Sequence, residues 1–204
     1  MIISDTKKFI FIHIPKTGGM SIRDKMEPHA TVNVWKGRAI PGVPAQTNKG
    51  MSKHAKARVV KANTNWGAYF TFAFVRNPWS WLVSGYHYAK KDKRDWRYKE
   101  ANRMPFNDYL RWTLESPDRR HTTLRLGQFD FLAENGKIIV DYVGKLETIT
   151  KNFSHVCKKI GVQAKLNHLN RTAHKDYRKY YDTDTRKLVT VHFRRDIQKF
   201  GYAF

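Results

Sequence analysis

Cysteine, acidic residues and long apolar runs are all scarce in this sequence. Cys157 is the single cysteine, which excludes an internal disulfide framework and a cysteine-based zinc site. One cysteine fits a reducing compartment, and residues 1–8 show no signal-peptide pattern before the first strand, so we expect a cytoplasmic protein. The longest apolar run, residues 69–75, is far shorter than the ~20 residues of a membrane helix, so no transmembrane segment is expected.

Acidic residues are few beside the basic ones. The 204 residues include 39 Lys and Arg against 17 Asp and Glu, a formal net charge of +22. A field of this sign concentrates anions, but it does not distinguish nucleic acid, acidic lipid, acidic glycans and nucleotides. Hydrophobic residues at 41% and aromatic residues at 14% are ordinary values, which exclude wholesale disorder, collagen and a membrane bundle. We expect one domain over residues 1–204.

Short apolar strands alternate with amphipathic helices along the chain. Strands are predicted at residues 9–14, 69–75 and 142–146, with a hairpin over 129–140. Helices are predicted at 21–26, 52–61, 78–91, 106–114, 149–160 and 183–199, and a long loop at 28–50. This pattern predicts an α/β fold, a single P-loop-like domain whose short central parallel sheet is flanked by helices. Ligands of such folds bind outside the carboxyl ends of the strands.

The first candidate site, PKTGGMS, follows the first predicted strand and leads into a helix. Such an arrangement presents backbone N–H groups and a helix N-terminus to an anion. Gly18 and Gly19 permit close approach of the backbone. Lys16 adds a cation, and Thr17 and Ser21 add hydroxyl donors. The lysine precedes the glycines, so this is not the GxxxxGK[ST] loop of nucleoside triphosphatases, and an ordinary turn with a solvated lysine is the alternative.

The second candidate site stands at the end of the second buried strand. Arg76 follows the run FAFV, and Asn77 with Pro78 predicts the start of a helix. Ser84 lies two turns into that helix, on a face that Arg76 can share. A guanidinium and a serine hydroxyl suit a phosphate group. If the two strands are neighbours, their tips lie ~5 to 10 Å apart, and the two sites fit one nucleotide with two separate phosphates.

The two motifs, HIPKTGGMSI and FAFVRNPWSWLVSGYHY, closely resemble those of sulfotransferases that use 3′-phosphoadenosine 5′-phosphosulfate (PAPS). The branch with carbohydrate 2-O-sulfotransferases and small bacterial or viral relatives is the most similar. The similarity continues through DYVGKLETITKNF and HLNRTAHKDYRKYYDTDTRKLV to FGYAF, nearly the whole chain. It implies PAPS as cofactor, the desulfated nucleotide PAP as product, and a hydroxyl acceptor that is a saccharide or polysaccharide.

The resemblance also implies roles for individual residues. The 5′-phosphosulfate would be bound by the backbone of Lys16, Thr17, Gly18, Gly19, Met20 and Ser21, and the 3′-phosphate by Arg76 and Ser84. Lys16 would neutralise the charge that builds on the leaving oxygen. Met20 stands where the family commonly has threonine, and Trp81 where it commonly has a basic residue. Met20 keeps its backbone donor, so we expect cofactor binding to weaken without failing.

A histidine is expected to accept the proton of the acceptor hydroxyl, because its pKa suits neutral pH. His54 precedes Arg76 by an offset that resembles that of the catalytic histidine in glycan 2-O-sulfotransferases, and a surface role in binding an acidic acceptor is the alternative. His29 is the second candidate, whereas His13, inside a strand, is expected to be a buried core residue.

A basic loop near the C-terminus carries the last candidate residues. Arg171 and Thr172, flanked by His168 and His174, are expected to bind the nucleotide if this loop folds over it. A solvated surface is the equal alternative for these residues.

Two other classes of function remain open. A basic nucleic-acid-binding module would explain the charge, with Trp66, Tyr69, Trp79 and Trp81 as stacking platforms, although core packing explains these aromatic residues better. A nucleotide-dependent phosphotransferase is disfavoured because the sequence has no Walker motif. We see no cluster of metal ligands and expect no metal. The surplus of positive charge instead suggests an anionic glycan as acceptor.

Overall fold

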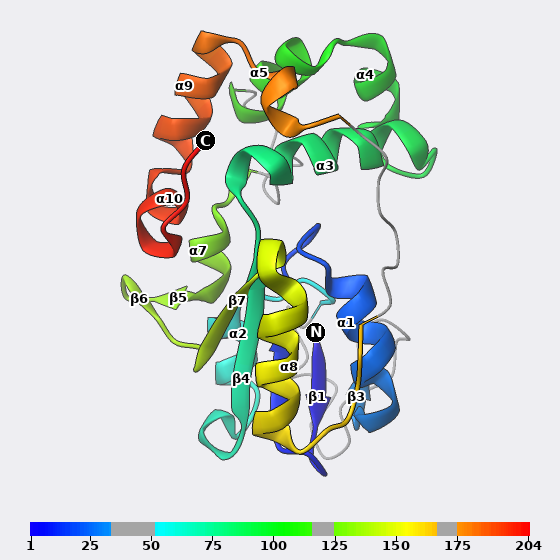
Figure 1. The fold of residues 1–204 in the computed structure, drawn as a ribbon, viewed down its shortest axis with the longest axis vertical. Helices are drawn as coiled ribbons and strands as arrows, with labels where there is room; N and C mark the ends of the chain where they lie inside the picture. Colours follow the sequence, from blue (N-terminus) through cyan, green and yellow to red (C-terminus); the bar gives the residue numbers. More distant parts are fainter. Residues whose placement is uncertain (34–51, 116–124, 167–174) are drawn as a thin grey trace. The chain divides into compact units, whose positions relative to one another are not determined.

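The computed structural model describes residues 1–33, 52–115, 125–166 and 175–204 (Figure 1). The chain forms two compact units. Met1–Val75 and Gln128–Asn170 make up the first, and Arg76–Gly127 and Arg171–Phe204 the second. Each unit buries apolar side chains of its own. A single domain over residues 1–204 stays a prediction.

A five-stranded sheet forms the centre of the first unit (Figure 1). Its strands are β1 (Ile2–Ser4), β2 (Phe9–Ile12), β3 (Val32–Asn33), β4 (Phe70–Val75) and β7 (Tyr142–Lys145). They lie in the order β3-β1-β2-β4-β7, in which β2, β4 and β7 are mutually parallel and β1 is antiparallel to both of its neighbours, β2 and β3. The predicted α/β fold with a central parallel sheet is confirmed, and two short antiparallel strands extend one edge.

Helices cover both faces of this sheet. They are α1 (Gly19–Met26), α2 (Ala57–Ala62), α7 (Gln128–Leu132) and α8 (Ile149–Ile160), with 3-10 turns η1 (Glu27–His29), η4 (Trp66–Ala68) and η6 (Leu146–Thr148). Apolar side chains of α1 and α8, among them Ile22 and Phe153, share one buried cluster with Phe11 and Phe72 of the strands. Figure 1 shows α8 in front of the sheet and α2 behind it. Strands covered on both faces explain why their sequences are continuous apolar runs.

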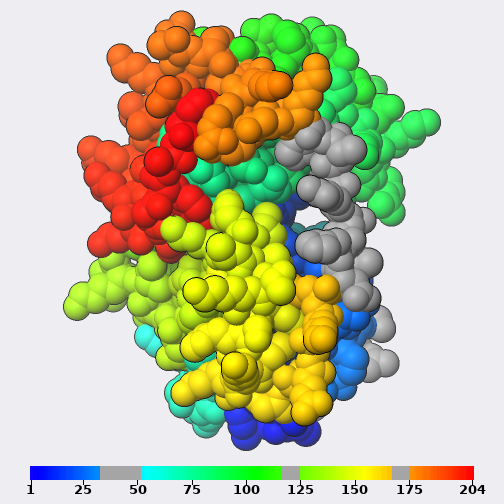
Figure 2. All heavy atoms as spheres, in the orientation of Figure 1, coloured from blue at the N-terminus to red at the C-terminus, as the bar shows by residue number. Residues whose placement is uncertain are grey.

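The outer side of α8 is polar. Its exposed residues include Thr150, Lys151, Ser154 and Lys158. Figure 2 shows this side, in yellow, at the surface of the first unit. The helix ends as expected at Gly161, whose φ of 64° is left-handed.

The described part of the second unit is helical. It consists of α3 (Pro78–Lys91), α4 (Tyr98–Arg103), α5 (Phe106–Glu115), η7 (Tyr177–Tyr180), α9 (Thr183–His192) and α10 (Arg194–Phe200). Trp81 is fully buried and its ring meets that of Phe193 edge-on at 5.8 Å. Phe106 similarly meets Tyr86 at 5.4 Å and Tyr181 at 5.0 Å. Edge-to-face contacts between aromatic rings therefore form much of the packing in this core.

Two predicted elements are wrong in type or continuity. Residues 129–132, predicted as a strand, form the helix α7, and the hairpin consists only of β5 (Ala133–Glu134) and β6 (Lys137–Ile138). A short apolar run fits a buried helix as well as a strand, and here packing chose the helix. The helix predicted at 183–199 is divided into α9 and α10 at Phe193, whose ring is buried in the core.

Two further predictions are corrected in the first unit. The helix predicted from Ser52 begins only at Ala57, because residues 53–54 form a turn in which the N–H of Ala55 bonds to the Ser52 carbonyl at 3.0 Å. The loop predicted at 28–50 contains the end of η1 and β3, and its positions 34–50 lie outside the described residues. β1 was not predicted, since three residues carry too little pattern.

Asn77 caps α3, as the sequence predicts. Its Oδ1 accepts the N–H groups of Trp79 at 3.1 Å and Ser80 at 3.2 Å, and its Nδ2 donates to the Ala203 carbonyl at 2.8 Å. Asn77→Ala should lower the free energy of unfolding by about 1–2 kcal/mol in urea denaturation, because the cap is lost. Asn77→Asp is the control, since a carboxylate still accepts both N–H groups and loses only the bond to the Ala203 carbonyl. Equal losses in the two variants would contradict a capping role.

Candidate functional site

The turn between β2 and α1 has the backbone geometry of an anion-binding loop. Lys16 and Gly18 adopt left-handed conformations, with φ of 63° and 84°. For a lysine this conformation costs roughly 1–2 kcal/mol, and such strain in a non-glycine residue is concentrated at functional sites. Gly18 is the N-cap of α1 and has no side chain with which to accept the first N–H groups of the helix. These groups therefore suit an anionic ligand.

The two glycines of the loop are required for different reasons. Gly18 is left-handed, and a Cβ there would lie 2.7 Å from Cδ1 of Leu146 and 2.8 Å from Cδ1 of Ile149. A Cβ at Gly19 would lie 1.8 Å from both Cδ2 and Nε2 of His13. Gly18 thus permits the turn of the backbone, whereas Gly19 permits an imidazole ring to pack directly on the first residue of α1.

The hydroxyl of Thr17 serves the loop itself. It is buried and donates to the carbonyl of Ile14 at 2.9 Å, so its single proton is used within the turn. The backbone N–H of Thr17 remains the group suited to a ligand, rather than the hydroxyl that the sequence suggested. Ser21 is also buried. The Met20 side chain is 40% exposed, so a methionine at this commonly threonine position does not disturb the packing of the loop.

His54 lies beside this loop, in the turn before α2. Its Nδ1 is 3.0 Å from the backbone oxygen of His13, and the two imidazole rings have their centroids 4.6 Å apart. A carbonyl oxygen only accepts hydrogen bonds, so Nδ1 of the neutral ring carries the hydrogen and Nε2 keeps its lone pair. His54 is therefore oriented as a proton acceptor through Nε2. His13 is buried, as the sequence predicts.

Both imidazoles are neutral at physiological pH. Burial, together with the nearby charges of Lys53 and the amino group of Met1, lowers the pKa of His54 to about 4, although the hydrogen bond to His13 opposes this shift. Burial also lowers the pKa of His13 well below its ordinary value, and the charges of His54, the Met1 amino group, Lys53 and Arg23 add to this effect. A neutral imidazole is the form that can accept a proton.

Arg76 and the start of α3 form the second part of the candidate site. Arg76 follows Val75, the last residue of β4, and its Nε donates to the Ser80 hydroxyl at 2.9 Å. Ser84 lies one turn further along the helix and is 2% exposed. The guanidinium thus lies on the helix face that carries both serines. Ser80 was not singled out from the sequence, although its spacing of four from Arg76 was a usable signal.

The remaining predicted residues include some that the structure does not describe. Arg171 and Thr172, with His168 and His174, lie outside the described residues. His29 ends η1 and is partly buried. Trp81 is in the core of the second unit, which accounts for an aromatic residue at a position that is commonly basic.

The described ranges contain neither a cluster of metal-ligating side chains nor a helix that could span a membrane. Within residues 1–33, 52–115, 125–166 and 175–204, His, Cys, Asp and Glu form no group of three that could hold a metal ion. Over the same ranges, every helix is too short or too polar to cross a bilayer.

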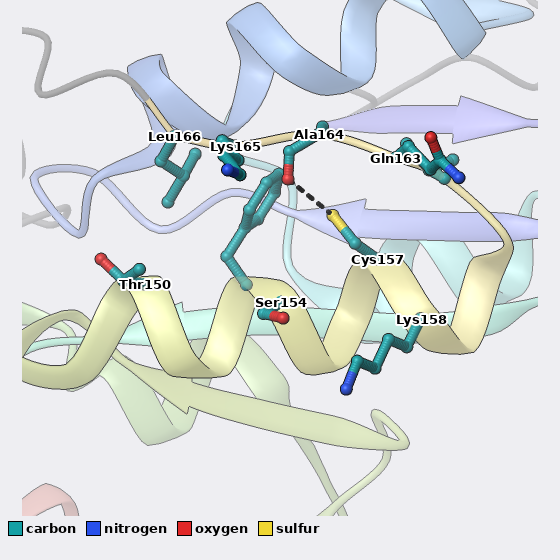
Figure 3. Close-up of a pocket in the computed structure, with 10 residues that line it drawn as sticks. Thr150, Ser154, Cys157, Lys158, Gln163, Ala164, Lys165 and Leu166 are labelled. Carbon is teal, nitrogen blue, oxygen red and sulfur yellow. Dashed lines mark hydrogen bonds between the residues drawn. The ribbon is translucent and has the colours of Figure 1, made fainter.

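A hollow of about 780 Å³ lies along α8 and the segment 162–166 (Figure 3). Phe153, Cys157 and Leu166 line it, together with polar residues such as Lys158, and none of the predicted site residues that the structure describes is among its lining residues. The Cys157 thiol points toward the Ala164 carbonyl at 3.9 Å, and burial raises its pKa. A protonated thiol is a poor nucleophile, so this hollow offers no catalytic cysteine.

The chain belongs to the sulfotransferase family, whose model, described as "Sulfotransferase family", matches residues 1–203. It is therefore a transferase of sulfuryl groups. A protein of Archaeoglobus fulgidus described as uncharacterized is 31% identical over 114 residues, which cover 54% of this chain and 84% of that relative. The resemblance to sulfotransferases is confirmed, while the carbohydrate 2-O branch stays a prediction.

The state of His54 can be measured directly. Since burial lowers its pKa to about 4, its ring signals in NMR spectra should not titrate between neutral pH and about pH 5. A His54→Gln variant identifies the signals by their loss. A titration midpoint near the ordinary value of 6.5 would show that the ring is solvated and would contradict its burial against His13.

Proposed function

We propose that this protein transfers a sulfuryl group from PAPS to a hydroxyl of a saccharide by in-line displacement at sulfur. The parallel pairing of β2 with β4 supports this proposal most strongly. Ile12, the last residue of β2, pairs with Ala73, two residues before the end of β4, so the carboxyl ends of both strands lie at the same edge of the sheet, on strands about 5 Å apart. The glycine loop follows one strand and Arg76 follows the other. Residence in the cytoplasm stays a prediction.

We assign the donor groups of the loop and those of α3 to the two phosphate ends of this nucleotide. Backbone N–H groups from Lys16 to Ser21 would bind the 5′-phosphosulfate, where the left-handed turn and the uncapped start of α1 suit an anion. Arg76 with Ser84 would bind the 3′-phosphate, and the position of Ser80 beside the guanidinium adds a third donor. Arg171 and Thr172 are assigned to the nucleotide by resemblance alone.

His54 and Lys16 would carry out the chemistry around the cofactor. PAPS supplies the sulfuryl group. His54 would accept the proton of the acceptor hydroxyl at Nε2, because the bond from Nδ1 to the His13 carbonyl places the hydrogen of the neutral ring on Nδ1. Lys16 would stabilise the negative charge on the leaving oxygen, from a position that its left-handed backbone holds at the start of the loop.

An anionic glycan is the acceptor that the charge favours. The net charge of +22 exceeds what one nucleotide requires, and a positive field attracts an acidic polysaccharide. Nucleic-acid binding receives less support, because two of the four aromatic residues considered as stacking platforms, Trp79 and Trp81, are 3% and 0% exposed. Their burial confirms core packing as their role.

The assignment of Arg76 is tested by isothermal titration calorimetry with PAP and with adenosine 5′-phosphate, which lacks the 3′-phosphate. Arg76→Ala should weaken PAP binding about 10- to 100-fold, because hydrogen bonds to charged groups are lost, and should leave adenosine 5′-phosphate nearly unaffected. Ser80→Ala and Ser84→Ala form a matched pair that separates the two serines. A wild-type protein that does not bind PAP would end the proposal.

The two catalytic assignments are tested by turnover with labelled PAPS and a set of acidic and neutral saccharides. His54→Ala should lower kcat by about 10²- to 10⁴-fold and leave PAP affinity nearly unchanged. Lys16→Ala should abolish transfer, because charge on the leaving oxygen is no longer stabilised. Wild-type turnover in His54→Ala would show that His54 is not the proton acceptor and would leave His29 as the second candidate.

A further inference from the structure

His13 lies between the glycine loop and His54, and the proposed chemistry leaves its side chain without a role. It is 3% exposed, so it cannot contact a substrate directly. It nevertheless contacts both parts of the candidate site in the first unit. Its ring packs on Gly19, and both its ring and its carbonyl contact His54.

The contact with Gly19 joins His13 to the loop. A Cβ at position 19 would lie 1.8 Å from the imidazole, well inside van der Waals distance, so the ring occupies the space of the missing side chain. Gly19 is the first residue of α1 and one of the residues whose N–H groups are proposed to bind the phosphosulfate. The position of the His13 ring therefore determines where the backbone of this first turn can lie.

The contact with His54 joins His13 to the base. The His13 carbonyl sets the tautomer of His54, and the ring centroids are 4.6 Å apart. When His54 accepts a proton, its Nδ1–H bond to the carbonyl becomes charge-assisted and the adjacent neutral ring faces a cation, both of which are favourable. Lys53 and the amino group of Met1 face both rings, and Arg23 also faces His13, so a charge on His13 would oppose the protonation of His54.

We propose that His13 is a positioning residue that holds the base and the first turn of α1 in one arrangement. Its neutral ring separates Gly19 from His54, so the proton acceptor and the group held by the loop keep a constant spacing. This inference rests on the proposed function for its catalytic consequence. The two contacts themselves can be tested without turnover.

A double-mutant cycle tests the contact with the loop. Gly19→Ala should lower both the thermal unfolding midpoint and the affinity for PAP, because its Cβ collides with the ring. In the His13→Ala background, Gly19→Ala should lower the unfolding midpoint and the PAP affinity much less, because the imidazole ring is absent. Gly18→Ala is the matched control, because its Cβ meets Leu146 and Ile149, and His13→Ala should not rescue it. Additive effects of Gly19→Ala and His13→Ala would overturn the proposal.

The contact with the base is tested in His13→Ala, with Ile12→Ala, at the adjoining end of β2, as the control for loss of a neighbouring buried side chain. His13→Ala should raise the pKa of His54 toward 6.5 in NMR titrations, because water reaches the ring. It should lower kcat by about 10- to 100-fold while PAP affinity changes little, because a displaced base loses the reacting geometry. Ile12→Ala should leave the pKa of His54 unchanged.

The outcomes separate this inference from the proposed function. Failure of the wild type to bind PAP or transfer sulfate would refute the function, while the unfolding midpoints and the His54 titration would still decide whether His13 joins Gly19 to His54. An unchanged His54 titration in His13→Ala, or equal losses of kcat in His13→Ala and Ile12→Ala, would overturn the inference and leave the function standing.

Discussion

The parallel pairing of β2 with β4 is the constraint on which the candidate site depends. Both strands are covered on both faces, and their apolar side chains are buried almost without exception, so a shift in register would disrupt two layers of packing at once. The pairing of Ile12 with Ala73 brings the two strand ends to one edge. The chemistry-bearing residues are those that the chain supplies immediately after these ends, as in other α/β folds.

The loop after β2 illustrates how a strained turn is maintained by its surroundings. Lys16 and Gly18 both adopt the left-handed conformation. Taken alone, this conformation is unfavourable for the lysine but accessible to the glycine. Leu146, the first residue of η6, and Ile149, the first residue of α8, pack over Gly18. His13 packs over Gly19. Because α8 is itself anchored in the core through residues such as Phe153, the stability of the hydrophobic core supports the geometry of the loop.

The environment of His54 combines two opposing effects. Burial and neighbouring cations keep the ring neutral, whereas the hydrogen bond to the His13 carbonyl favours its protonated form. An imidazole in this balance can accept a proton but depends on nearby negative charge to retain it. A bound anionic cofactor at the adjacent loop would supply such charge, which links occupancy of the loop to the basicity of His54.

The sequence alone determined the α/β class, the three parallel strands, the cap at Asn77 and the glycine turn, because these follow from local periodicity and from residues with special backbone chemistry. It did not determine that residues 129–132 are helical or that α2 starts only at Ala57, since short segments take the structure that packing favours. Only the tertiary structure placed the His13 ring on Gly19 and its carbonyl on His54, because contacts between side chains far apart in the chain depend on how the strands and helices pack, and no local pattern encodes that packing.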